Sequence, residues 1–149
     1  MILIIDTKII SAISIVPCFL FVVVFNVHAQ LYIDGVELNV VIVGNIGVPE
    51  KESTVKRTAV DTIKKMHQQR PFHLGINPGN NVYPHGSKVN DFETLDKIFR
   101  SSFHASSFNF DFLTVLGNTD HDGDIDTQIQ YHHQKDSRFY LPKRNYNHG

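Results

Sequence analysis

The sequence predicts an α/β protein made of three β-α units with a mainly parallel sheet. Three short runs rich in β-branched or aromatic residues, at 38–44, 72–76 and 110–117, are typical of buried strands. A stretch with helical periodicity follows each run, and strands joined through helices by right-handed crossovers lie parallel. A Gly-Asn pair also comes at or just beyond the end of each run.

The first predicted helix extends from Ser53 to Gln69, and Pro71 prevents its continuation. Its apolar residues recur at helical spacing, as expected of a helix that packs one side on a sheet. These residues are Val55, Ala59, Val60, Ile63 and Met66.

The second helix is predicted to begin with a capping box formed by Asn90 and Glu93. Its apolar side carries Phe92, Leu95, Ile98 and Phe99. Asp124 is the predicted N-cap of the third helix, which continues to about Gln134, and Pro142 prevents a simple continuation beyond it.

The composition is typical of one globular domain. The chain has 149 residues, of which 42% are hydrophobic and 19% charged, so disorder is not expected. The formal net charge is −1, which argues against a broad basic surface for nucleic acid or anionic membranes.

Residues 1–29 have the pattern of a signal peptide. Lys8 precedes an apolar stretch from Ile9 to Phe25, and Val27 and Ala29 are spaced as in a signal-peptidase site. Cleavage after Ala29 predicts a secreted or lysosomal protein whose mature part, 30–149, contains no cysteine and no membrane segment. The alternative is an uncleaved signal anchor.

The strand-end loops are the candidate functional segments. They read "GNIG" (44–47), "GNNVY" (79–83) and "GNTDH" (117–121). Ligands of open α/β sheets bind beyond the carboxyl ends of the strands, so these loops are expected to form one site.

These three loops resemble the first metal-binding blocks of the metallophosphoesterases, or calcineurin-like phosphoesterases. The likeness is closest to the small purple acid phosphatases of tartrate-resistant type, whose blocks usually read Gly-Asp-Trp-Gly, Gly-Asp-Asn-Phe-Tyr and Gly-Asn-His-Asp. It continues through "GNNVYPHG", "FETLDKIF" and "TQIQYHHQKDSRFYLP", and covers about residues 38 to 146.

The resemblance implies a partial metallophosphoesterase α/β/β/α sandwich, in which residues 30–149 supply the parallel strands of one sheet. A partner protein is then expected to cover the exposed sheet face. The implied activity is that of an acid phosphatase, a hydrolase of phosphate monoesters. The implied cofactors are iron and a second divalent metal (Fe, Zn or Mn), with a metal-bound hydroxide attacking phosphorus.

Residue by residue, the resemblance implies an altered site. Asn45 stands where the family has a carboxylate on the iron, and Asn80 stands where it has the bridging carboxylate. Tyr83 and Asn118 match the tyrosinate and amide ligands. Thr119 stands where the family has a histidine near the leaving group.

The other positions of these blocks include both matches to the family and replacements. Asp120 and His121 match the residues that follow, and Ile46 replaces the usual tryptophan. The family's three later histidine ligands have no counterpart up to Gly149. Because amides are neutral and do not bridge cations as carboxylates do, the sequence predicts that no complete di-metal centre forms and that catalysis is impaired.

Simpler interpretations stay open at this stage. The three asparagines suit loop residues with unusual φ/ψ angles. An acidic series, Asp120, Asp122, Asp124 and Asp126, raises the possibility of a calcium loop, although helix capping by Asp124 explains it more simply. The functional alternatives are a pseudoenzyme descended from a secreted phosphatase, a non-catalytic secreted module that binds an anion or a protein, and a truncated gene product.

Overall fold

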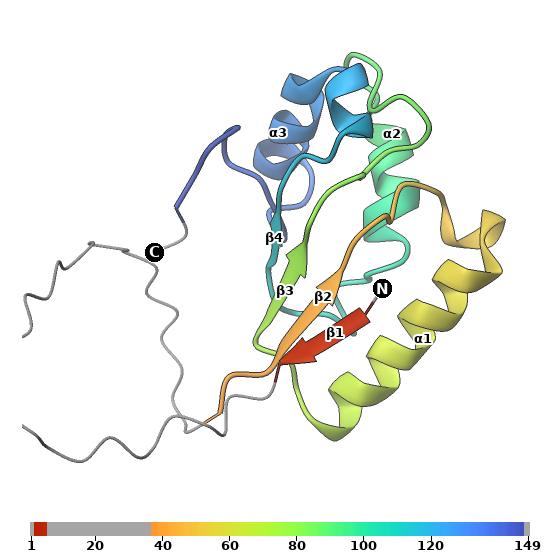
Figure 1. Cartoon of the computed structure of the whole chain (residues 1–149), viewed down its shortest axis with the longest axis vertical. Coiled ribbons are helices and arrows are strands. Elements are labelled where there is room, and N and C mark those ends of the chain that lie inside the picture. Colours follow the sequence, from red (N-terminus) through yellow and green to blue (C-terminus); the bar gives the residue numbers. More distant parts are fainter. Residues whose placement is uncertain (1, 6–36, 148–149) are drawn as a thin grey trace, which may run out of the picture.

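The computed structural model describes residues 2–5 and 37–147 of the chain, and it contains a five-stranded sheet in the order β1-β2-β3-β4-β5 (Figure 1). The strands are β1 (Ile2–Ile5), β2 (Val40–Val43), β3 (Leu74–Asn77), β4 (Phe112–Thr114) and β5 (Phe139–Tyr140). Strands β2 to β5 are parallel, and β1 pairs antiparallel with β2. The predicted α/β class with a mainly parallel sheet is confirmed.

The three predicted strands form, but each is shorter than its apolar run. β5 was not predicted, because a strand of two residues carries no alternation that could distinguish it from a loop. Most of the predicted leader lies outside the described residues, and its residues 2–5 form β1.

The helices are α1 (Thr54–Gln69), α2 (Phe92–Leu95), which continues into the π-helical turn η2 (Asp96–Arg100), and α3 (Ile125–Gln134). Two short 3-10 helices, η1 (Glu50–Glu52) and η3 (Thr119–Asp122), follow β2 and β4. In Figure 1, α1 and α2 lie along the same side of the sheet.

The helix starts confirm the predicted cap at Asp124, which accepts a hydrogen bond from Thr127 N. Ser53, predicted as the first residue of its helix, is the N-cap of α1 and accepts a hydrogen bond from Lys56 N. The predicted capping box of Asn90 and Glu93 is wrong. Asn90 has a φ of 60°, whereas an N-cap residue is usually extended, and Asp91 caps α2 instead by accepting from Thr94 N.

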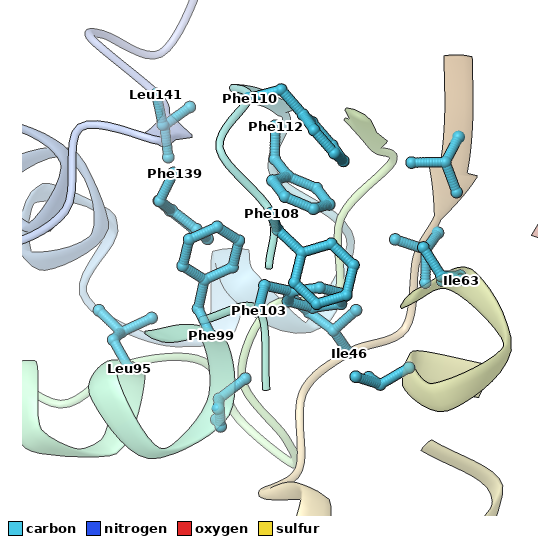
Figure 2. Close-up of a cluster of buried hydrophobic side chains, with 14 of the residues drawn as sticks. Ile46, Ile63, Leu95, Phe99, Phe103, Phe108, Phe110, Phe112, Phe139 and Leu141 are labelled. Atoms are coloured by element: carbon cyan, nitrogen blue, oxygen red, sulfur yellow. The ribbon is translucent and has the colours of Figure 1, made fainter. Parts of the chain in front are cut away.

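An aromatic core fills the space between the sheet and the helices (Figure 2). The ring of Phe99, on η2, lies 5.3 Å from that of Phe112 and 5.2 Å from that of Phe139, both edge-to-face. Gly75 of β3 permits this packing, since a Cβ there would lie 2.4 Å from Cδ1 of Phe112. The core therefore depends on the missing side chain at this position.

The two faces of the sheet differ in how deeply their side chains are buried. Val41, Val43, Phe112 and Phe139 point into the buried core together with residues of all three helices. The alternate positions belong to the second face, where strand register aligns four half-buried side chains. These are Ile42, Ile76, Leu113 and Tyr140.

Lys56 links α1 to its surroundings through a buried amino group. Its Nζ donates hydrogen bonds to the carbonyl oxygens of Ile46 (2.8 Å), Val48 (2.7 Å) and Ile98 (2.6 Å). Burial lowers the pKa of Lys56 to about 7, and the nearby Glu50 carboxylate opposes this shift. The group thus joins the loop after β2 to both α1 and η2.

We expect the free energy of unfolding to rise with pH between about pH 7 and about pH 9.5. In this range the folded state has released the Lys56 proton, while the unfolded chain, with the ordinary pKa of 10.5, still holds it. The unfolded state therefore binds more protons, and raising the pH favours the folded state. Urea unfolding at a series of pH values measures the slope.

The control is Lys56→Met, which has no group to titrate and should lose most of this slope. Lys51→Met, at an exposed position on η1, should keep it. A wild-type slope that persists in Lys56→Met would show that another group is responsible.

Candidate functional site

The three Gly-Asn loops meet at the carboxyl edge of the sheet. Asn45 N donates to Gly79 O (3.1 Å), and Tyr83 N donates to Gly47 O (2.8 Å), so the first and second loops are joined through their backbones. The third loop is equally close, since a Cβ on Gly117 would lie 2.2 Å from Oδ1 of Asn80. The loops therefore form one continuous surface.

Two of the asparagines have left-handed backbone conformations. The φ angles are 57° at Asn45 and 59° at Asn80, and Asn is one of the few non-glycine residues that adopts this region readily. This conformation turns the chain sharply at the end of each strand and directs both side chains toward the same point.

The side chains of Asn45, Asn80, Tyr83 and Thr119 form a hydrogen-bonded group, which we call the amide cluster. Asn45 Oδ1 accepts from Asn80 Nδ2 (2.8 Å) and from the Tyr83 hydroxyl (2.9 Å). Asn80 Oδ1 accepts from Thr119 N (3.3 Å) and Oγ1 (3.2 Å). Four residues that the resemblance matches to ligand or catalytic positions thus bind one another.

The remaining predicted positions have different surroundings. Asn118 is the N-cap residue of η3 and is exposed, as is His121. Asp120 is fully buried, and its carboxylate accepts from the backbone N–H groups of Asn81, Val82 and Gly117. Asp120 therefore fixes the second and third loops rather than facing a ligand.

A buried polar network beneath the amide cluster was missed by the sequence analysis. Asn77 Nδ2 donates to Asn81 Oδ1 (2.6 Å), and Asn81 Nδ2 donates to Gln128 Oε1 (3.0 Å). Gln128 Nε2 in turn donates to Asp120 Oδ1 (3.0 Å). The available signal was Asn77, a polar residue directly after an apolar strand run, which must find a buried partner.

The amide cluster does not fit the di-metal centre that the resemblance implies. An amide is neutral, and the Asn45 carbonyl oxygen already accepts two hydrogen bonds. Asn80 directs a nitrogen at Asn45, and an amide nitrogen does not coordinate a cation. Within residues 2–5 and 37–147, no group of three or more His, Cys, Asp or Glu residues is placed to hold a metal ion.

The acidic series does not gather around one point. Asp120 is buried among amides, and Asp124 caps α3. Oδ2 of Asp122 lies 3.9 Å from Nδ1 of His85, and Oδ1 of Asp126 lies 3.4 Å from Nη2 of Arg144. These four carboxylates have separate partners, and the geometry gives no support to a calcium loop.

A cavity of about 170 Å³ lies beside the first loop. Its lining includes Asn45, Ile46, Lys56 and Phe103, but not Asn80, Tyr83 or Thr119. Because it touches the amide cluster only at Asn45, it does not form a pocket for a ligand bound by the whole cluster.

No protein-family model matches this chain, and the search of curated proteins found no match. The resemblance to purple acid phosphatases consequently rests on the sequence motifs. In the part of the chain that the structure describes, no helix has the length and apolar character needed to cross a bilayer.

We expect Asp120→Asn to lower the free energy of unfolding by roughly 2–4 kcal/mol. The carboxylate accepts from three backbone groups and one side chain, and an amide would place an N–H donor against some of these donors. Denaturant unfolding measures the change. The matched control is Asp122→Asn in the same 3-10 helix, whose exposed side chain should tolerate the change within about 0.5 kcal/mol. Equal effects in the two variants would contradict the structural role of Asp120.

Proposed function

We propose that this chain is a secreted, non-catalytic relative of the purple acid phosphatases, in which the amide cluster occupies the place of the di-metal centre. The observation that supports this proposal is the contact of 2.8 Å between Asn80 Nδ2 and Asn45 Oδ1. It joins the two positions where the family has metal-binding carboxylates. The two amide side chains are thus hydrogen-bonded to each other without a cation between them.

Tyr83 supports the same conclusion. Its hydroxyl donates a hydrogen bond to Asn45 Oδ1, and only the neutral phenol has a proton to donate. A tyrosinate ligand of iron would instead carry a negative charge and would repel this amide oxygen. Tyr83 therefore serves as a neutral donor that orders the first loop.

Thr119 cannot replace the family's histidine as a general acid. A threonine hydroxyl does not release its proton near neutral pH, whereas a histidine does so readily. Its hydroxyl donates a hydrogen bond to Asn80 Oδ1. We infer that Thr119 helps to hold the second loop in place. Neither proton transfer nor metal activation of water has a candidate group within the amide cluster.

The proposed role of the loop edge is recognition. Within the amide cluster the Tyr83 side chain is exposed. The segments that carry Tyr83 and Thr119 also present three exposed side chains with donors and acceptors, His85, Asn118 and His121. Such side chains bind a polar ligand or a protein surface without a catalytic step. Phosphate esters are the first ligand class to test, because the resemblance points to them.

The decisive experiment measures metal content, colour and turnover in one preparation of the secreted protein. After incubation with iron and zinc and removal of excess metal, we expect substoichiometric metal by elemental analysis and no visible charge-transfer band. We also expect no hydrolysis of para-nitrophenyl phosphate at acidic pH. Stoichiometric metal together with turnover would overturn the proposal.

The positive control is the double variant Asn45→Asp/Asn80→Asp. It brings two carboxylates together where the wild type has a hydrogen bond of 2.8 Å, so their repulsion should destabilise the metal-free protein. A divalent cation relieves this repulsion, and we expect zinc to raise the melting temperature of the double variant but not that of the wild type. An equal rise in both proteins would show that the wild-type cluster already binds the ion.

A further inference from the structure

Among the residues that the structure describes, the outer edge of β2 pairs with β1, which belongs to the predicted leader. β1 consists of residues 2–5, and its register on β2 matches Ile2 with Val43 and Ile5 with Val40. These residues belong to the segment 1–29, whose removal is part of the proposed secreted function. Cleavage after Ala29 would therefore take away the strand that pairs with this edge.

Backbone directions identify which groups lose their partners. Asn39 O accepts from His73 N, and Asn45 N donates to Gly79 O, so the odd-numbered residues of this segment face β3. Backbone groups alternate along a strand, which directs the N–H and C=O groups of Val40 and Ile42 toward β1. Loss of β1 exposes these two donors and two acceptors on one edge.

This edge lacks the features that normally prevent strand addition. Protected edges carry charged residues, proline or a bulge. Residues 38–48, which read "LNVVIVGNIGV", contain no charge and no proline, and the strand itself is made of four β-branched residues. It remains able to pair with another extended strand.

A second copy of the same edge satisfies the pairing requirements. A two-fold axis at Val41 places Val40 of one copy opposite Ile42 of the other, so the outward-facing backbone groups meet as hydrogen-bonded pairs. No like charges meet across this register, and β-branched residues opposite one another favour an antiparallel pair. The strand that β2 accepts in the structure, "ILII", is also apolar and antiparallel.

We propose that the chain, once residues 1–29 are removed, forms a two-fold dimer through antiparallel pairing of β2 with β2 of a second copy. The product is one continuous sheet of eight strands, four from each copy. This inference rests on the leader cleavage contained in the proposed function, and it is independent of whether the amide cluster binds metal.

The test expresses the full sequence in a secretory host and determines the N-terminus by mass spectrometry. For a chain that begins at Gln30, sedimentation velocity should show a dimer. Ile42→Lys places a charge on the pairing edge and should give a monomer. Val55→Lys is the matched control, because Val55 is 79% exposed on α1 and is not part of β2, so this variant should remain dimeric.

A second measurement needs no variant. In the dimer, the amide hydrogens of Val40 and Ile42 should exchange at least about tenfold more slowly than in dilute monomer, because pairing protects them. Those of Val41 and Val43, which face β3, provide the internal reference. A Gln30 chain that stays monomeric, or Ile42→Lys that stays dimeric, would overturn the dimer but leave the metal-free proposal intact. A retained Met1 would overturn the dimer together with leader cleavage.

Discussion

The buried carboxylate of Asp120 is the interaction on which the loop edge depends. It accepts hydrogen bonds from the backbone of Asn81 and Val82 in the second loop and Gly117 in the third. Gln128 of α3 adds a side-chain donor, so a helix, two loops and the ends of two strands share one anion. A charge in this position is stable because these donors point toward it. The positions of Asn80 and Thr119 follow from this arrangement.

Much of the fold could be predicted because it follows from periodicity. The apolar spacing of the first helix and the cap at Asp124 are local signals, and parallel pairing follows from the alternation of strands and helices. The failures also have local causes. Asn90 and Asp91 are both good capping residues, and only the left-handed backbone at Asn90 decides between them. The strand β5 depends on tertiary pairing with β4 and leaves no pattern of its own.

The site was predictable in position but not in its internal chemistry. Gly-Asn pairs after three parallel strands place the loops at one edge, and the structure brings them together there. Which amide oxygen accepts from which donor depends on side-chain directions that spacing alone does not specify. The network of Asn77, Asn81 and Gln128 illustrates this limit, since its members are distant in sequence and meet only in the folded chain.

The glycine at position 75 also favours an interior place for β3 in the sheet. β3 directs only Gly75 and Asn77 toward the helices, so its inner face contributes little apolar surface of its own. Such a strand is stable only in the interior of a sheet, where the ring of a neighbour such as Phe112 extends across it. At an outer position, one flank of its backbone would be left open to solvent. The smallest residue in the sheet thereby restricts the topologies available to this chain.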